Sequence, residues 1–320
     1  MCTAICFNSH QSYFGRNLDL ECSYNESVTV TPRNFPLRFS KGEHYAIIGM
    51  AAVIDGYPLY YDAANEKGVC MAGLNFPDNC VYQKERVDKE NIPSYDFISY
   101  VLARSADMND VKNIIKSINI TDTPFKEKLL PSPLHWIISY KGECLTVENG
   151  AEGIKAYENK VGVLSNNPPF GYHLQNLSNY MNLSAAPPKN QFAPNFNIKE
   201  YSRGMGAMGL PGDLSSSSRF VRAAFMKLNS VCDDNEPSTV MQFFHILDTV
   251  KQIRGANRLE SNIYEITLYS GCINADRGIY YYKTYENSTI NAVDMNREDL
   301  SGNTLKIFPL KTEMQINYQN

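Results

Sequence analysis

The 320-residue sequence lacks the features that mark several large classes of protein. It has no run of Lys or Arg, and its 34 acidic and 30 basic residues give a net charge of −4, so the basic surface of a nucleic-acid-binding protein is missing. Its longest nearly apolar segment, residues 45–54, is about half as long as the roughly 20 residues that a membrane-spanning helix needs. We therefore expect no nucleic acid as a partner and no insertion into a membrane.

Cysteine and histidine patterns typical of metal sites are missing too. The eight cysteines form no CxxC pair and no Cys/His cluster at zinc spacing, so neither a bound metal nor a disulfide framework is predicted. His135 and His245 lie in apolar runs, where a buried histidine is the favoured interpretation and a Cys-His dyad the lesser alternative. The first ten residues contain no basic stretch followed by an apolar one, so we expect no secretory signal. We therefore expect the protein to be cytoplasmic and its thiols to be reduced.

The residues that are present predict a sheet-rich fold. The chain contains 21 Tyr and 15 Phe, and six short β-rich runs broken by turn residues lie between Cys2 and Phe76. Helical spacing of apolar residues follows over residues 95–119 and again over 218–228 and 239–250. Strands separated in blocks from helices predict an α+β fold of antiparallel sheets with helices packed outside, in one domain over residues 1–320.

Cys2 is a candidate nucleophile because of its position. Removal of Met1 would leave a residue that carries both a thiol and an α-amine. An α-amine has an ordinary pKa of about 7.7 to 8.0, so part of it is a free base at neutral pH. Cys2 could then supply nucleophile and base together, as an N-terminal Thr does. The alternative is that Cys2 is an ordinary small buried residue.

Arg16 and Asp19 lie close enough in the sequence to support Cys2. The permanent charge of Arg16 could favour the thiolate, and Asp19 could orient the amine. Because residues 16 and 19 would lie on opposite faces of a flat strand, this interpretation requires a bend near Asn17. A surface ion pair is the alternative.

Three further polar residues are candidates for binding a negatively charged oxygen. Asn75 and Asn166 stand where strands pass into loops and could hold an oxyanion, although asparagine is also a common turn residue. Arg219 lies near the start of a predicted helix, where the helix dipole favours anions, so it indicates an anionic partner or a nearby carboxylate unless it is simply solvated. The glycine-rich segment 204–212 lacks the ending of a phosphate-binding loop, and we expect no nucleotide.

Taken in order, these segments resemble the choloylglycine hydrolase family, the N-terminal-nucleophile enzymes that comprise bile salt hydrolases and penicillin V acylases. The resemblance covers nearly the whole chain and is carried by MCT, FGRNLD, VTPRNFP, ANEKGVCMAGLNFP, SPLHWIIS, GVLSNNPPF, GLPGDLSSSSRFVRAAF and GIYYYKTYENSTINAVDM. It implies an αββα four-layer sandwich of two antiparallel sheets between helix layers. It also implies a homotetramer that uses no metal or organic cofactor.

The resemblance assigns catalytic roles to six residues. They are the nucleophile Cys2, its partners Arg16 and Asp19, the oxyanion-binding Asn75 and Asn166, and Arg219, which contributes to the electrostatics of the site. The sequence departs from many relatives beside Asn166, where Ser165, Pro169 and Gly171 replace Thr, Thr and Asp.

The resemblance also implies a substrate, an amide of a bile acid with glycine or taurine. Asn75 is the residue type of bile salt hydrolases, whereas many penicillin V acylases have Tyr there. Tyr201, Ser202 and Arg203 resemble a loop variant linked to taurine conjugates, and Arg203 could pair with a sulfonate or a carboxylate.

An apolar cleft should hold the steroid, and we expect Leu20, Tyr60 and Leu134 to line it. Two alternatives to a bile salt hydrolase are a penicillin V acylase with the same machinery and an inactive relative that binds steroids or other lipids.

Overall fold

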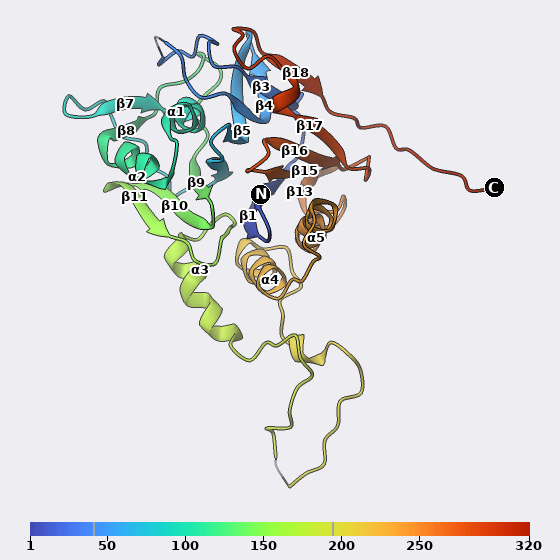
Figure 1. Ribbon diagram of the computed structural model, residues 1–320. Coiled ribbons are helices and arrows are strands. Elements are labelled where there is room, and N and C mark those ends of the chain that lie inside the picture. Colours follow the sequence, from blue (N-terminus) through green and yellow to red (C-terminus); the bar gives the residue numbers. More distant parts are fainter. Residues whose placement is uncertain (41, 194) are drawn as a thin grey trace.

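Two antiparallel sheets lie face to face in the computed structural model, which describes residues 1–40, 42–193 and 195–320 (Figure 1). The six strands of the first sheet run in the order β12 (Val163–Leu164), β1 (Cys2–Asn8), β2 (Ser12–Leu20), β15 (Ile266–Asn274), β16 (Ile279–Thr284) and β17 (Asn291–Asp294). The eight strands of the second run in the order β11 (Gly153–Glu158), β10 (Glu143–Gly150), β9 (Leu134–Tyr140), β6 (Cys70–Asn75), β5 (Tyr57–Asn65), β4 (Ile47–Ile54), β3 (Ser27–Thr31) and β18 (Lys306–Pro309).

Helices cover the outer face of each sheet. On the first sheet, α4 (Ser216–Leu228) contacts β1, and α5 (Glu236–Asp248) contacts β2 and β15 (Figure 1). On the second, α1 (Phe97–Arg104) contacts β5 and β6, with α2 (Met108–Ser117) beside it. These four layers confirm the predicted αββα sandwich. The shorter elements are α3 (Phe170–Asn176), the parallel pair β7 (Glu90–Pro93) and β8 (Ile118–Thr121), the pair β13 (Arg258–Glu260) and β14 (Ile263–Tyr264), and four 3₁₀ turns at Ser94–Asp96, Leu177–Tyr180, Met205–Ala207 and Met295–Arg297.

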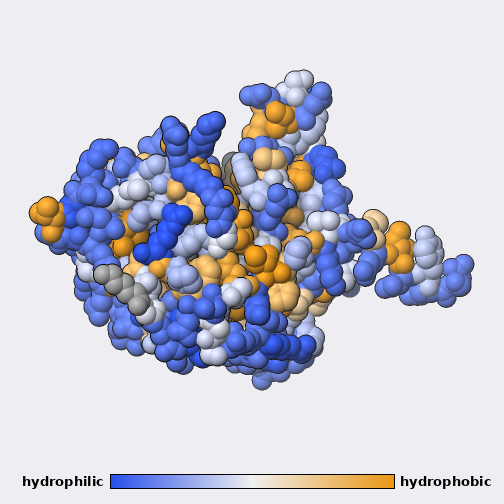
Figure 2. Space-filling model, turned by 90° about the horizontal axis from the view of Figure 1, so that it is seen from above, coloured by the Kyte–Doolittle hydropathy of each residue, from blue (hydrophilic) through white to orange (hydrophobic). Residues whose placement is uncertain are grey.

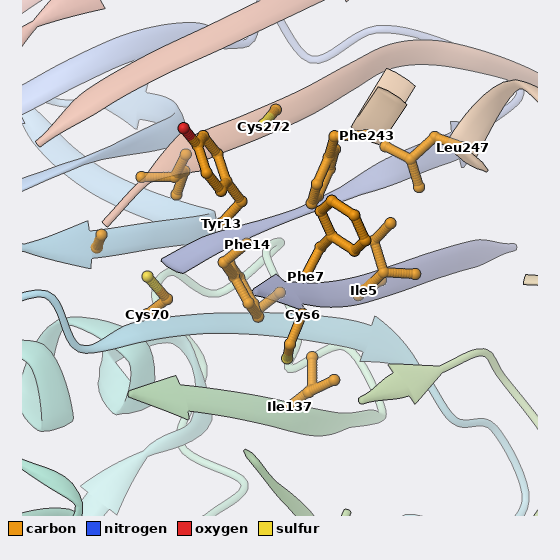
Figure 3. Close-up of a cluster of buried hydrophobic side chains, with 14 of the residues drawn as sticks. Ile5, Cys6, Phe7, Tyr13, Phe14, Cys70, Ile137, Phe243, Leu247 and Cys272 are labelled. Atoms are coloured by element: carbon orange, nitrogen blue, oxygen red, sulfur yellow. The ribbon is translucent and has the colours of Figure 1, made fainter. Parts of the chain in front are cut away.

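Two clusters of buried side chains hold these layers together. The first core cluster lies between the sheets and beneath α4 and α5, and contains Cys2. Figure 3 shows other members of this cluster, among them Phe14, Ile137 and Phe243. The second core cluster, which includes Trp136, lies between the second sheet and α1 and α2. Each large apolar side chain buried in this way contributes roughly 1.5 to 3 kcal/mol to folding. The face shown in Figure 2 is largely polar, with apolar side chains gathered near its middle.

The predicted strands and helices are largely confirmed, and the missed elements are short strands. The first six predicted strands correspond to β1 to β6, and the predicted helices to α1, α2, α4 and α5. The sequence did not indicate β11 or β18, which lie at the two edges of the second sheet and contain no buried residue. An exposed edge strand needs no alternation of apolar and polar residues, so its sequence carries little signal.

Gly15 allows β2 and β15 to approach closely, because a Cβ atom there would lie 2.0 Å from the carbonyl oxygen of Gly271. We predict that Gly15→Ala lowers the free energy of unfolding by about 1 to 3 kcal/mol, since the backbone must shift to accept the methyl group. Urea unfolding measures this change. Gly171→Ala in α3 is the control, because its new methyl group would meet no atom within 4 Å. Equal effects of the two substitutions would contradict the prediction.

Candidate active site

Cys2 is buried at the start of β1 and pairs with Leu18 of β2. Its backbone nitrogen donates a hydrogen bond to Oδ1 of Asn166 at 2.7 Å. Its carbonyl oxygen accepts one from Arg219 of α4. The first residue of the strand is therefore held from two sides by side chains that are distant in the sequence.

Asn166 follows the short strand β12 and makes hydrogen bonds through its backbone N–H and through both polar atoms of its side chain. Its Oδ1 also accepts from Nη2 of Arg219 at 2.8 Å, while its Nδ2 donates to the carbonyl oxygen of Asn75 at 2.7 Å. Its backbone N–H donates to Oγ of Ser216 at 2.8 Å. An amide nitrogen has two hydrogens, so one hydrogen of Nδ2 remains for a ligand.

Two histidines hold the backbone behind Asn166. A ring nitrogen of His135 donates to the carbonyl oxygen of Ser165 at 2.8 Å, and one of His173 donates to that of Asn166 at 2.9 Å. Both rings are fully buried, and burial lowers the pKa of His173. His135 is thus a buried histidine rather than part of a Cys-His dyad. Its contact with Ser165 could not be predicted from the sequence, because His135 lies in an apolar strand far from residue 165.

Arg219 is fully buried near the first turn of α4. Its Nε donates to the carbonyl oxygen of Leu214 at 3.0 Å, and its Nη1 donates to Oγ1 of Thr3 at 2.5 Å as well as to Cys2. Burial lowers the pKa of Arg219, while the charges of Asp19 and Cys2 oppose that change. Arg219 is therefore part of the site and not a solvated residue at the end of a helix.

Arg16 reaches from the first sheet to the second. Its Nη1 donates to the carbonyl oxygen of Tyr61 at 3.3 Å and to that of Gly73, while its Nη2 has no hydrogen-bond partner among the described residues. Burial alone would lower the pKa of Arg16, but the negative charge of Cys2, with smaller contributions from other groups, raises it. The guanidinium group therefore stays charged in the layer between the sheets.

Asp19 lies one position beyond the residue that pairs with Cys2 and is fully buried. Its Oδ1 accepts from Oγ1 of Thr267 at 2.6 Å, and its Oδ2 has no partner among the described residues. Burial raises the pKa of Asp19, although Arg219 opposes that rise. The sequence predicted a bend near Asn17, but the pairing of β2 with β1 is regular there. The irregularity lies in the neighbouring strand β15, between Thr267 and Tyr269.

Met1 precedes β1 and is hydrogen-bonded to Asp19 of β2. Its amine donates to the carbonyl oxygen of Asp19 at 2.8 Å and forms an ion pair with Glu265. Asp19 returns a hydrogen bond from its own N–H to the carbonyl oxygen of Met1 at 3.0 Å. While Met1 is attached, the nitrogen of Cys2 belongs to a peptide bond and cannot act as a base. Its removal would create an amine at the place where Asn166 already accepts a hydrogen bond.

Asn75 ends β6, and its side chain is exposed. Its backbone carbonyl joins the site through Asn166, and its side-chain amide makes no hydrogen bond among the described residues. The structure thus joins four of the six predicted catalytic residues by hydrogen bonds from Asn166 and Arg219, with Cys2 and Asn75 taking part through their backbones. Arg16 and Asp19 are linked to this group by charge.

The structure corrects the predicted role of Tyr60. Its ring lies in the second core cluster, and its hydroxyl group is 2.7 Å from Oγ1 of Thr31, so it does not face Cys2. The cause is a β-bulge in β5, because Asp62 and Tyr60 pair with consecutive residues of β4 and Tyr61 is left without a partner. Tyr61 packs against the first core cluster instead. Simple alternation along the strand cannot reveal such a bulge.

The remaining predicted substrate contacts are placed differently from one another. Leu20 packs against the first core cluster, which contains Cys2. Leu134 pairs with Asn75 but packs against the second core cluster. Tyr201, Ser202 and Arg203 are exposed in the long connection between α3 and α4, which extends away from the sheets (Figure 1). In this chain, the structure does not bring these three residues to Cys2.

The described residues contain no group of three or more His, Cys, Asp or Glu side chains placed to hold a metal ion. In the same part of the chain, no helix has the length and apolar character needed to cross a membrane.

The fold and the buried N-terminal strand define the class of N-terminal-nucleophile hydrolases. A model of the family described as linear amide C–N hydrolases, choloylglycine hydrolase family, matches residues 2–308. The chain belongs to this family and is a hydrolase of linear amides.

Similar proteins support this assignment. The chain is 50% identical to the bile salt hydrolase/transferase of Lactiplantibacillus plantarum over 319 residues, which is 98% of each chain. The solved structure of the C2A mutant of conjugated bile acid hydrolase from Clostridium perfringens is 38% identical, covers 100% of both chains and superimposes with a TM-score of 0.92. Penicillin V acylase from Agrobacterium tumefaciens, 18% identical with a TM-score of 0.74 over 99% of this chain and 100% of that one, shares the fold.

The Ser216 hydroxyl connects Asn166 to α4, since it accepts from the Asn166 N–H and donates to Oγ of Ser165 at 2.9 Å. We predict that Ser216→Ala lowers kcat of amide hydrolysis about tenfold, because Asn166 loses a support and a buried donor loses its acceptor. Steady-state kinetics with the purified enzyme measure the effect. Ser217→Ala, one position along the same helix and without a side-chain hydrogen bond in the structure, should leave kcat unchanged. A normal kcat for Ser216→Ala would count against the role of this hydroxyl.

Asp19 should lower stability at neutral pH while serving the site. Its pKa is raised in the folded state, so the ionised carboxylate destabilises the fold at neutral pH, and this cost disappears as the pH falls below about 4, the ordinary value of Asp. We therefore predict that Asp19→Asn inactivates the enzyme and raises the free energy of unfolding at pH 7. The gain should shrink toward pH 4 in urea unfolding series. A variant that is less stable than the parent at pH 7 would contradict this sign.

Proposed function

We propose that the protein hydrolyses conjugated bile salts at the amide bond to glycine or taurine, with Cys2 as the nucleophile after Met1 is removed. The observation that carries this proposal is the contact between the backbone nitrogen of Cys2 and Oδ1 of Asn166, in a buried site that also contains two arginines. The names of the similar proteins, bile salt hydrolase/transferase and conjugated bile acid hydrolase, support the choice of substrate.

In the proposed reaction, the α-amine of Cys2 takes the thiol proton, and the thiolate attacks the amide carbonyl carbon. The charge of Arg16 favours the thiolate. The side-chain amide of Asn75 and the free hydrogen of Nδ2 on Asn166 donate to the oxyanion. The α-amine then returns the proton to the departing nitrogen, the C–N bond breaks, and a thioester is left on Cys2. Water cleaves the thioester, releases the bile acid and restores the thiol.

The proposed preference for taurine rests on the resemblance of residues 201–203 to a loop linked to taurine conjugates, and not on a contact with Cys2 within one chain. The guanidinium group of Arg203 could pair with a sulfonate or with a glycine carboxylate. We also propose that the enzyme is a cytoplasmic homotetramer, as its family resemblance implies. Light scattering on the purified protein measures the mass of the assembly, and a monomer would contradict this part of the proposal.

Release of the amine from taurocholate, glycocholate and penicillin V under reducing conditions tests the function. We expect both bile salts to be cleaved faster than penicillin V, and taurocholate fastest. Faster cleavage of penicillin V would identify an acylase, and cleavage of none of the three would favour a relative that only binds lipids. Intact mass should show that Met1 is absent from the active chains. Protein made while methionine aminopeptidase is inhibited should keep Met1 and be inactive.

Cys2→Ser should reduce turnover to background without lowering the melting temperature, because serine has nearly the same size but is a weaker nucleophile than a thiol beside an amine. Cys232→Ser is the matched control and should keep full activity. Cys232 is half-buried and packs against the edge of the first core cluster without being one of its buried members. Turnover by Cys2→Ser close to that of the parent would refute the mechanism.

A further inference from the structure

A second charged group crosses the layer between the sheets close to Arg16. Asp62 lies on β5 of the second sheet and is fully buried. Its Oδ2 accepts a hydrogen bond from the hydroxyl of Tyr269 on β15, and its Oδ1 accepts one from the hydroxyl of Tyr280 on β16 at 2.6 Å. Both tyrosines belong to the first sheet and are fully buried. Asp62 therefore reaches from the second sheet to the first, while Arg16 reaches from the first to the second.

The backbone is shaped to keep this arrangement. Gly271 of β15 pairs directly with Arg16, and a Cβ atom at Gly271 would lie 2.4 Å from the hydroxyl oxygen of Tyr280. The absence of a side chain at this position gives the phenol its path to Asp62. Since both carboxylate oxygens of Asp62 accept from phenols, the hydrogen bonds suit its ionised form.

An ionised carboxylate in an apolar layer is costly unless its charge is used or balanced. Burial raises the pKa of Asp62, and the charge of Arg16 is the largest influence that opposes this rise. The influence is mutual, because Asp62 is among the groups that raise the pKa of Arg16. No hydrogen bond joins the two side chains in the described structure. Asp62 balances the charge of Arg16 while leaving Nη2 of Arg16 unoccupied.

We propose that Asp62 is a positioning residue of the amide-hydrolysing site, which acts through Arg16 by fixing how much of the guanidinium charge Cys2 experiences. Arg16 is held in place by the carbonyl oxygens of Tyr61 and Gly73, so its location does not depend on Asp62. What Asp62 supplies is the counter-charge. This inference rests on the proposed roles of Cys2 and Arg16.

Several other groups contribute to the field at these residues. Around Cys2 these are Asp19 on β2, Arg219 on α4 and the chain-terminal amine with its neighbour Glu265; around Asp62 they are the two phenols and Cys70 on β6. Asp62→Asn keeps the size of the side chain and removes its charge. One of the two phenols must then accept a hydrogen bond from the amide nitrogen of Asn instead of donating one.

Asp62→Asn removes the counter-charge of Arg16 and leaves Arg16 bound to the carbonyl oxygens of Tyr61 and Gly73. The deprotonated form of the nucleophile then becomes easier to reach, so the acidic limb of the kcat/KM profile should move to lower pH, on the order of half a unit to one unit. The same shift should appear in the pH profile for alkylation of Cys2 by iodoacetamide, followed by the mass of the N-terminal peptide of the mature enzyme.

Asp96→Asn is the matched control. Asp96 is also buried and accepts a hydrogen bond from a phenol, that of Tyr57 at 2.6 Å, but it lies beside the second core cluster on the far face of the second sheet. Its substitution makes the same chemical change away from Arg16 and should leave both profiles in place. A purely structural Asp62 would lower the melting temperature in Asp62→Asn without moving either profile, and that result would overturn the proposal. A shift to higher pH would overturn it too.

Tyr280→Phe decides the matter should Asp62→Asn fail to fold. It keeps the carboxylate but removes one donor, so Asp62 is ionised less readily, and both profiles should shift in the same direction by a smaller amount. Tyr13→Phe removes a buried hydroxyl of the first core cluster that does not contact Asp62, and should cause no shift. Equal profiles for the two variants would overturn the proposal. Alkylation needs no bile salt, so a shift in alkylation without bile salt cleavage would reject the proposed substrate and keep the role of Asp62.

Discussion

The site depends on the complete burial of the Arg219 guanidinium group. A buried cation is costly unless its N–H groups are hydrogen-bonded, and those of Arg219 find acceptors on Leu214, Cys2, Thr3 and Asn166. These acceptors belong to the approach to α4, to the N-terminal strand and to the loop after β12. The cation can be buried only when all three segments are in place. The requirement that stabilises the fold therefore also assembles the site.

The burial of the site between the sheets strengthens the interactions among its charges. Coulomb interactions are weak in water and several times stronger where water is excluded. Two arginines, Asp19 and Asp62 are all fully buried here, and each alters the protonation of its neighbours. The protonation of a thiol and an amine at the start of β1 would depend on these fixed charges more than on the solvent. Burial of the large apolar clusters on both sides of the second sheet offsets the free-energy cost of burying these charges.

Much of the architecture could be predicted from the sequence, because strands and helices with one buried face repeat apolar residues at a recognisable period. The motifs around Cys2, Arg16, Asn75 and Asn166 indicated the family, and the match to residues 2–308 confirmed it. Edge strands such as β11 were missed because they are exposed. The bulge at Tyr61 was missed because nothing in the sequence of β5 shows where the pairing with β4 slips by one residue.

The sequence by itself determined the family, the layered fold and the identity of the residues around Cys2, because these depend on local periodicity and on the order of motifs along the chain. Only the tertiary structure decided how those residues meet. It showed that Asn166 accepts hydrogen bonds from both Cys2 and Arg219, and that Tyr61 rather than Tyr60 turns toward the first core cluster. It also showed that the charges of Asp62 and Arg16 interact. These relations join residues far apart in the chain. They depend on strand register, sheet packing and burial, which no local pattern of residues records.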